Sequence, residues 1–369
     1  MKFSVSRDAL LRPLQLVAGV VEKRQTLPAL ANVLVVLEGQ QLSLTGTDLE
    51  VEIIGRLTLE SEGIVGGEIT VPAKKFLDIC RSLPDGSMIE FVYQDQKVTV
   101  KSGRSRFTLS TLPASEFPAI ELGDNDLSFR CDQGEVKRLI DRTCFAMAQQ
   151  DVRYYLNGML WELHDDVLRV VATDGHRLAM CTRPVNIAVN GEVKQAILPR
   201  KGVIELARLL SESDKSVELV VGNNHIRAVT DSFVFTSKLV DGKFPDYERV
   251  LPRNGDKIVL GNREELRQAF ARTSILSNEK YRGVRFVLTE GQVTITASNP
   301  EQEEAEEQVA VEYQGPPIEV GFNVSYLQDV ANVISSESLR ITLADSNSSA
   351  LVEDPDNSDS LYVVMPMRL

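Results

Sequence analysis

The chain has 369 residues, well over the length of a typical single domain, so two or three domains with separate cores are expected. Apolar residues make up 43% and charged residues 25%, which excludes collagen-like, low-complexity and disordered chains. Acidic residues outnumber basic ones by 53 to 40, for a formal net charge of −13. This balance argues against a uniformly basic nucleic-acid coat, although it is compatible with a local basic surface.

No segment approaches the roughly 18 uninterrupted apolar residues that a membrane helix needs. The N-terminus carries Arg7, Asp8 and Arg12 where a secretory signal would be apolar. We therefore expect a cytoplasmic protein without a membrane partner.

The cysteines Cys80, Cys131, Cys144 and Cys181 lie far apart, unlike the closely spaced pairs of structural zinc sites. We expect four buried, reduced thiols, no metal and no cofactor.

A long internal repeat organises the chain. Three segments each alternate like a strand and then enter a turn that contains Asp or Asn: residues 41–50, 167–177 and 292–301. The matching turn residues are Asp48, Asp174 and Asn299, separated by 126 and 125 positions. Such a period is far longer than a solenoid repeat, so it indicates one domain present three times.

Helical periodicity recurs at two corresponding places in each repeat. The predicted helices span 7–21, 73–83, 134–145, 200–210, 263–272 and 324–334. Alternating segments joined by short turns predict antiparallel hairpins between them. The fold class is α+β, with two helices packed on antiparallel sheets in each of three domains, 1–126, 127–254 and 255–369.

Two local features of the first predicted helix bear on its start. Ser6 is a candidate N-cap, because its hydroxyl can accept a hydrogen bond from the first turn. Pro13 is expected either to kink the helix or to mark its true start.

The predicted helices are basic although the chain is acidic. Together the six carry +6, so the remaining residues carry −19, much of it in segments such as 301–307 (EQEEAEE). Solvated helix faces would explain any one helix. Five of six helices share the positive sign, and helices facing one way would form a surface able to meet phosphates without reading bases.

The sequence contains no P-loop, dinucleotide-binding glycine motif, HExxH or GxSxG motif. The nearest approach to a catalytic cluster is Asp174-Gly175-His176-Arg177, where His and Asp could orient one another for general base catalysis. The other repeats hold Asp48 and Asn299 at the same turn, which favours a structural role and leaves His176 a surface role.

Two further segments have the composition of contact surfaces. The loop at 149–155 carries Arg153, Tyr154 and Tyr155, which could contact phosphate and stack on a nucleic acid; a tyrosine in the core is the alternative. The terminal residues 363–369 are apolar to the end, which suits either an adaptable partner-binding surface or a buried last strand.

These residues together resemble the beta subunit family of bacterial DNA polymerase III, the sliding clamps, along the whole chain. The segments that carry the resemblance are LSLTGTDLE, SGRSRFTLSTLPA, QDVRYYLNGML, VATDGHRLA, PRKGVIEL, FTSKLVDGKFPDY, ILSNEKYRGVR, NPEQEEAEE, GFNVSY and YVVMPMRL. The resemblance implies a head-to-tail homodimer closed into a ring around double-stranded DNA. It implies a processivity factor and no catalytic residue.

The resemblance also implies roles for individual residues. The DNA-contacting candidates are Arg24, Lys74, Gln150, Tyr154 and Tyr155. The dimer-interface candidates are Phe107, Leu109, Ile275 and Leu276. A groove for short apolar peptide motifs of client proteins maps onto Arg153, Leu156, Thr173, Gly175, His176, Arg177, Leu178, Pro245, Arg249, Val250, Asn323, Tyr326, Ser349, Val363, Val364, Met365, Pro366, Met367 and Arg368.

The clients that the resemblance implies are the replicative DNA polymerase, the clamp loader, translesion polymerases, ligase and mismatch-repair proteins. Tyr281 stands where the family often has Phe, and Asn347 where it often has an aliphatic residue, so affinity at the rim of the groove is expected to differ. An enzyme that uses Asp174 and His176, and a dimeric scaffold that does not bind DNA, are the competing hypotheses.

Overall fold

The computed structural model describes residues 1–21, 27–60, 62–120, 127–185 and 193–368. The chain forms two compact units, one of Met1–Gly134 with Lys201–Leu239 and one of Glu135–Arg200 with Val240–Leu369. This division cuts through the second sequence repeat. The domain boundaries expected from the repeats stay a prediction, and the expected joint at 121–126 lies outside the described residues.

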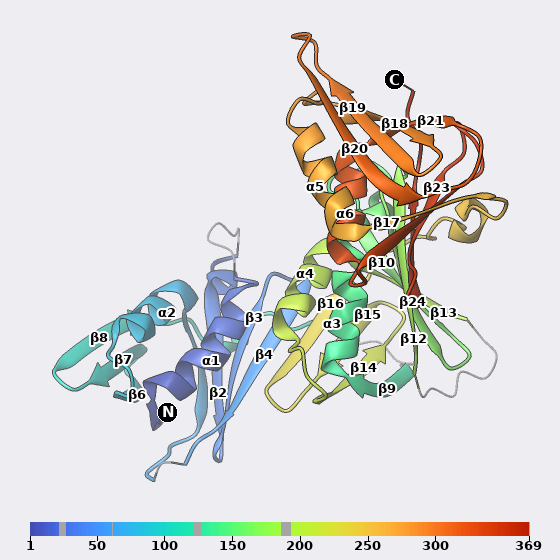
Figure 1. Cartoon of the computed structure of the whole chain (residues 1–369). Coiled ribbons are helices and arrows are strands. Elements are labelled where there is room, and N and C mark those ends of the chain that lie inside the picture. The colour runs from blue at the N-terminus through green and yellow to red at the C-terminus, as the bar shows by residue number, and fades with distance from the viewer. Residues whose placement is uncertain (22–26, 61, 121–126, 186–192, 369) are drawn as a thin grey trace. The chain divides into compact units, whose positions relative to one another are not determined.

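The first unit is built from antiparallel strands and amphipathic helices (Figure 1). Its helices are α1 (Arg7–Ala18), α2 (Ala73–Ser82) and α4 (Arg200–Leu209), with short 3₁₀ turns η1 (Pro28–Ala31) and η2 (Ala114–Glu116). Its strands are β1 (Lys2–Ser6), β2 (Asn32–Glu38), β3 (Gln41–Thr47), β4 (Val51–Thr58), β5 (Gly67–Pro72), β6 (Met88–Gln94), β7 (Lys97–Ser102), β8 (Ser105–Ser110), β9 (Leu127–Asp132), β14 (Ser216–Val221), β15 (His225–Val229) and β16 (Phe233–Lys238).

The structure of α1 shows the roles of Ser6 and Pro13. The Ser6 hydroxyl accepts a hydrogen bond from the Ala9 N–H at 3.3 Å, so Ser6 is the N-cap as predicted. The helix begins at Arg7 and continues through Pro13, so the proline does not mark the start. Gly55 on β4 permits the close approach of this helix, because a Cβ there would lie 2.8 Å from the Pro13 Cβ.

Two sheets form the first unit. One has the strand order β5-β2-β3-β4-β16-β15-β14-β9, and the other has the order β1-β6-β7-β8. The first joins two sequence repeats, because β4 of the first pairs with β16 of the second and places Ile53 opposite Phe235. Strand β8 lies at the edge of the second sheet, with β7 as its neighbour.

The second unit has the same kind of construction. Its helices are α3 (Gln133–Asp141), α5 (Arg263–Ser274) and α6 (Val324–Val333), with the 3₁₀ turns η3 (Cys144–Ala146), η4 (Tyr154–Leu156) and η5 (Tyr247–Val250). Its strands are β10 (Gly158–His164), β11 (Val167–Thr173), β12 (Arg177–Pro184), β13 (Lys194–Pro199), β17 (Lys257–Asn262), β18 (Gly283–Thr289), β19 (Gln292–Ser298), β20 (Glu304–Glu312), β21 (Ile318–Asn323), β22 (Ser338–Leu343), β23 (Ala350–Asp354) and β24 (Asn357–Val364).

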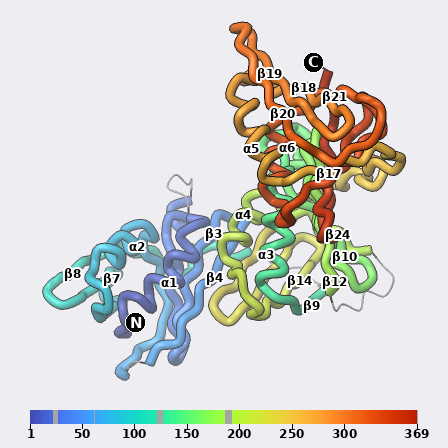
Figure 2. The backbone as a smooth tube through the Cα atoms, in the orientation of Figure 1, coloured from blue at the N-terminus to red at the C-terminus, as the bar shows by residue number. Residues whose placement is uncertain are grey.

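One antiparallel sheet runs through the second unit, in the order β13-β10-β11-β12-β24-β23-β22-β17-β20-β19-β18-β21. It again joins two repeats, because β12 of the second pairs with β24 of the third and places Ala179 opposite Tyr362. The contact between β17 and β20 is short, with paired positions only at Leu260–Glu312 and Gly261–Val311. Helices α5 and α6 lie side by side (Figures 1 and 2).

The expected α+β class is confirmed, and all six predicted helices are present with ends that differ by a few residues. Among the described residues, no helix is long and apolar enough to cross a membrane. The described residues also contain no cluster of side chains suited to a metal ion.

The cysteines are free, as expected, but only two of them are fully buried. Cys80 and Cys181 are inaccessible, whereas Cys131 and Cys144 are half-buried, so the expectation of four buried thiols is wrong for these two. Burial raises the pKa of the Cys80 thiol to about 12, which keeps it protonated and inert at neutral pH.

Candidate functional site

A groove with a volume of about 300 Å³ opens on the second unit. Its walls come from η4, the turn between β11 and β12, η5 and the end of β24. The residues that line it are Arg153, Leu156, Thr173, Gly175, Arg177, Leu178, Pro245, Asp246, Tyr247, Val250, Ser349, Val363 and Met365. All but two of these were predicted from the sequence.

The groove rests on a buried apolar cluster. The cluster consists of Leu160, Val171, Leu178, Ile197, Phe244, Tyr247 and Val363, drawn from five strands, from η5 and from the segment that leads into it. Leu178, Tyr247 and Val363 belong to both the cluster and the groove, so the floor of the groove is the exposed side of a packed core. Such a floor is preformed and suits apolar side chains.

The turn between β11 and β12 is held by Asp174. The Asp174 Oδ1 accepts hydrogen bonds from the backbone N–H groups of His176 at 2.9 Å and Arg177 at 3.0 Å. The Oδ2 accepts a hydrogen bond from the side-chain Nε of Arg177 at 3.1 Å. Asp48 accepts the matching bonds from the backbone N–H groups of Glu50 and Val51, and Asn299 accepts one from Glu303, four residues on, in its own turn. The structural interpretation of the shared Asp or Asn is therefore confirmed, and the Asp174 carboxylate bonds its own turn and Arg177.

Arg177 is fixed from several sides. Its guanidinium pairs with Asp329 of α6 as well as with Asp174, and it donates to the Phe145 carbonyl at 2.8 Å. The Tyr326 ring lies 4.4 Å from the guanidinium carbon. Arg177 therefore presents a rigid edge to the groove, with its charge balanced by two carboxylates.

Arg153 lies at the mouth of the groove. It makes a two-pronged ion pair with Asp151, at 2.9 Å from Nε and 2.8 Å from Nη2, and these bonds lower the pKa of Asp151 to about 2. Gly175 faces this guanidinium with φ +88°, and a Cβ at that position would lie 3.0 Å from the Arg153 Nη2. The left-handed backbone at 175 favours glycine, although Leu49 adopts φ +78° at the matching position of the first repeat.

The terminal segment contributes to two hollows. The Met365 N–H donates to the His176 carbonyl at 3.0 Å, which extends the pairing of β24 with β12 and places Met365 in the groove. The Met367 N–H donates to the Gly321 carbonyl at 2.8 Å. Met367 and Arg368 line a second hollow of about 880 Å³ together with Tyr281.

The other predicted groove residues lie around the groove and do not line it. They are His176, Arg249, Asn323, Tyr326, Val364, Pro366, Met367 and Arg368. Asn323 caps α6 by accepting from the Ser325 N–H at 2.9 Å, and the exposed Arg249 pairs with Asp246 at 2.7 Å. Asn347 is exposed in a turn held by Asp345.

Asp246 and Tyr247 line the groove but were not predicted. Their signal in the sequence is their position directly after Phe244 and Pro245, in a segment that recurs from the first repeat. Only the structure shows that the Tyr247 side chain turns into the cluster and is 6% exposed.

The candidates for nucleic-acid contact are mostly exposed. Lys74 lies on α2 of the first unit and forms no ion pair with a described residue. In the second unit Gln150 is exposed, Tyr154 is 57% exposed, and Tyr155 packs against the apolar cluster. The alternative of a tyrosine in the core thus applies to Tyr155, whereas contact of the exposed Tyr154 with nucleic acid stays a prediction. Arg24 lies outside the described residues.

Many helix cations of the described chain are already paired with carboxylates. These pairs are Lys137 with Asp141, Arg138 with Asp359, Arg208 with Glu205, Arg267 with Glu264 and Arg272 with Glu307. Asp141, Glu205 and Glu264 are already counted in the net charge of their own helices, so among these pairs only those with Asp359 and Glu307 offset the predicted basic character.

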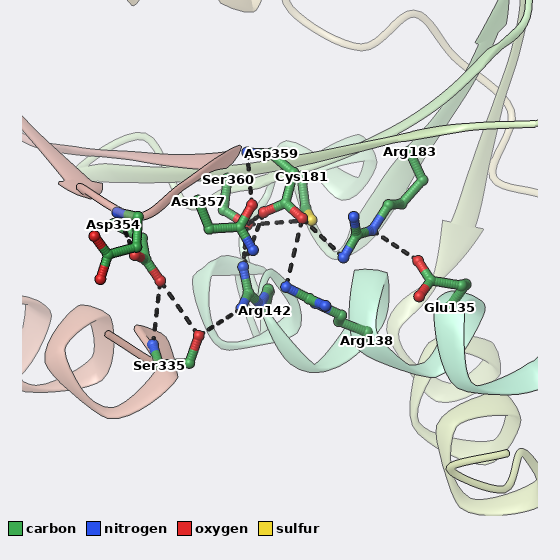
Figure 3. Close-up of polar contacts among 11 residues, drawn as sticks. Glu135, Arg138, Arg142, Cys181, Arg183, Ser335, Asp354, Asn357, Asp359 and Ser360 are labelled. Atoms are coloured by element: carbon green, nitrogen blue, oxygen red, sulfur yellow. Dashed lines mark hydrogen bonds and ion pairs between the residues drawn. The ribbon is translucent and has the colours of Figure 1, made fainter. Parts of the chain in front are cut away.

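The carboxylate of Asp359 on β24 forms ion pairs with three arginines (Figure 3). Its carboxylate lies 2.9 Å from Arg142 and 2.8 Å from Arg183, with Arg138 farther at 3.5 Å. Arg142 also donates to Ser335 at 3.0 Å. This network ties α3 of the second repeat to the strand and loop of the third, within the second unit.

The candidate interface residues lie in two places, on the edge strand β8 and at the C-terminal end of α5. Phe107 and Leu109 lie on the edge strand β8, where Leu109 is 6% exposed. Ile275 follows α5 and is 73% exposed, with Leu276 half-buried beside it. A single exposed isoleucine is ordinary on a protein surface, so the interface role of these residues stays a prediction.

Comparison with known proteins agrees with this architecture. Models of the DNA polymerase III beta subunit match three parts of the chain: the N-terminal domain over residues 1–121, the central domain over 130–246 and the C-terminal domain over 248–368. The chain belongs to the DNA polymerase III beta subunit family. It functions as a DNA sliding clamp, a processivity factor in DNA replication, and it is not an enzyme.

Relatives and solved structures match over their entire length. The chain is 64% identical to the beta sliding clamp of Pseudomonas aeruginosa and 52% identical to that of Escherichia coli K12, with full coverage of both chains in each case. A crystal structure of the Pseudomonas aeruginosa clamp bound to griselimycin matches with a TM-score of 0.98 at 64% identity. The clamp of Caulobacter crescentus matches with a TM-score of 0.92 at 38% identity, again over all of both chains.

The structural role of Asp174 can be tested by substitution. Asp174→Ala should lower the free energy of unfolding by about 1–3 kcal/mol, because it removes an ionised acceptor of two backbone N–H groups. Asp174→Asn should lower it less, because its amide oxygen can still accept both backbone bonds and only the ion pair with Arg177 is lost. Urea denaturation measures both, and equal losses in the two variants would contradict this role.

Proposed function

We propose that two copies of the chain close into a ring around duplex DNA, and that the ring carries client proteins in the groove of the second unit. The observation that carries this proposal is the way in which successive repeats share sheets. Strand β4 of the first repeat pairs with β16 of the second, and β12 of the second pairs with β24 of the third. The equivalent strands left over are β20 in the third repeat and β8 in the first.

The two leftover strands are suited to one another. Among the described residues β8 is an edge strand, and β20 meets β17 only at its C-terminal end. Exposed Arg104 and Arg106 lie at or beside β8, while β20 carries Glu304, Glu306 and Glu307. Pairing β20 with β8 of a second copy would cover both edges with complementary charge, and its repetition closes a dimer.

The repeats also predict the register of this pairing. Phe107 on β8 corresponds to Phe235 and Tyr362, because all three lie opposite the preceding strand at equivalent positions. Ala305 on β20 corresponds likewise to Ile53 and Ala179. Since Ile53 faces Phe235 and Ala179 faces Tyr362, Ala305 should face Phe107 of the second copy.

The charge distribution supports sliding along the duplex. Several helix cations are paired to carboxylates, which weakens their attraction to phosphates and allows a closed ring to move along the duplex. Topology then supplies processivity without sequence recognition. We propose Arg24, Lys74, Gln150, Tyr154 and Tyr155 as the residues that contact DNA, of which Lys74 supplies charge and the exposed Tyr154 a stacking surface.

The groove is proposed as the docking site for clients. Its preformed apolar floor and rigid Arg177 edge suit a short peptide with large apolar side chains. The proposed clients are the replicative polymerase, the clamp loader, translesion polymerases, ligase and mismatch-repair proteins. Because these act on the bacterial chromosome, the proposed location is the cytoplasm.

Cross-linking tests the proposed pairing of β20 with β8. The doubly substituted chain Phe107→Cys, Ala305→Cys should form an intermolecular disulfide on mild oxidation. The equivalent pairs within the chain, Ile53 with Phe235 and Ala179 with Tyr362, are non-hydrogen-bonded pairs. The Cα atoms of such antiparallel pairs are about 4.5 Å apart, which is close enough for a disulfide. Denaturing electrophoresis measures the dimer.

The matched control is Phe107→Cys, Glu306→Cys. Glu306 neighbours Ala305 on the same strand but points to the opposite face of the sheet, so this pair should cross-link poorly. Equal cross-linking of both pairs, or none in either, would contradict the register.

Truncation tests the groove. Removing residues 365–369 deletes Met365 from the groove wall while leaving β24 paired with β12 through Val364. The truncated chain should lose measurable binding of the purified replicative polymerase subunit in surface plasmon resonance, yet remain a dimer in analytical ultracentrifugation. Undiminished polymerase binding after truncation would contradict the proposal that clients dock in the groove.

A further inference from the structure

A row of polar side chains crosses the sheet behind the groove. Glu162 on β10 lies directly opposite Arg169 on β11 and directly opposite Gln195 on β13, so the three side chains share one face of the sheet. Glu162 is 8% exposed. None of the three lines the groove.

The row converges on one hydroxyl group, that of Tyr247. This hydroxyl donates to the Glu162 Oε1 at 2.7 Å and accepts from the Arg169 Nη1 at 2.8 Å. The second carboxylate oxygen of Glu162 accepts from the Gln195 Nε2 at 2.6 Å. Arg169 also lies 3.3 Å from Glu162 and 3.8 Å from Glu248, the residue after Tyr247.

Tyr247 connects this row to the groove. Its ring belongs to the apolar cluster and to the groove lining, and it is the first residue of η5, whose last residue, Val250, lines the same wall. A four-residue 3₁₀ turn has weak internal hydrogen bonds, and Asp246 gives this one no side-chain cap. The position of the wall therefore depends on how Tyr247 is held. Burial raises the pKa of Tyr247 to about 12, which keeps its hydroxyl protonated and able to donate.

We propose that Glu162, Arg169 and Gln195 are positioning residues for client binding, which act through the Tyr247 hydroxyl to fix the η5 wall of the groove. This inference rests on the proposed docking role of the groove. If the wall is already ordered before a client binds, binding does not have to include the entropic cost of ordering it. Loss of the row should therefore raise the dissociation constant for the client. Removing it should leave the fold in place and loosen one wall.

Tyr247→Phe tests the proposal, because it removes only the hydroxyl. We expect the dissociation constant for the purified replicative polymerase subunit to rise about threefold to tenfold, because the hydrogen bonds of this hydroxyl to Glu162 and Arg169 are lost. The matched control is Tyr313→Phe. Tyr313 is also buried, at 3% exposure, and its hydroxyl donates to the Pro316 carbonyl at 2.7 Å, away from the groove.

The control separates positioning from stability. Tyr247→Phe loses two hydrogen bonds and Tyr313→Phe loses one, so both should melt at a lowered temperature, but only Tyr247→Phe should bind the polymerase more weakly. An equal loss of affinity in both variants, or an unchanged affinity in Tyr247→Phe, would overturn the proposal.

Two variants at Glu162 check that the row acts through the hydroxyl. Glu162→Leu removes the acceptor and should weaken binding as Tyr247→Phe does, with little further loss when the two are combined. Glu162→Gln keeps an acceptor oxygen for Tyr247 and should restore most of the affinity. Fully additive losses in the combined variant would overturn the proposal.

The chain truncated at residues 365–369 keeps the two claims apart. If truncation abolishes polymerase binding while Tyr247→Phe binds normally, the groove stands and the positioning role falls. If truncation leaves binding intact, the docking role itself falls.

Discussion

The sharing of sheets between successive repeats is the constraint on which the rest of the structure depends. In the first and second repeats, the edge of one strand is covered by a strand of the next repeat. Strand β16 covers β4 in this way, and β24 covers β12. A sheet edge left open presents unpaired N–H and C=O groups and invites association. Among the described residues, two of the strands equivalent to these four are not covered by another repeat, β8 and the N-terminal part of β20, and the family's closed ring is the arrangement that uses both.

The same seam builds the candidate peptide groove. Because β24 of the third repeat pairs with β12 of the second, Val363 and Met365 come to lie beside Leu178 and Arg177. The network around Asp359 holds the other end of β24 against α3. The groove thus exists only where two repeats meet, and its polar supports lie behind its walls, outside the cavity.

Much of this could be predicted from the sequence because the signals are local or repeated. Ser6 caps α1 through a bond within four residues, and the helices follow from apolar spacing that recurs three times. What the residues alone did not predict depends on long-range pairing. Arg138 meets Asp359 across more than two hundred positions, and Tyr247 faces Glu162 because β10 happens to run beneath η5. Neither Asp246 nor Tyr247 differs from an ordinary loop residue until the fold places it.

The central claim is that the protein holds DNA by encircling it, and one measurement tests this directly. The purified protein is loaded onto nicked circular duplex DNA by a clamp loader with ATP, and its retention is followed by gel filtration before and after the DNA is cut once. A protein that encircles DNA stays with the circle and is lost when the circle becomes linear. Retention that persists on the linear DNA would contradict the claim, because binding would then depend on contacts and not on topology.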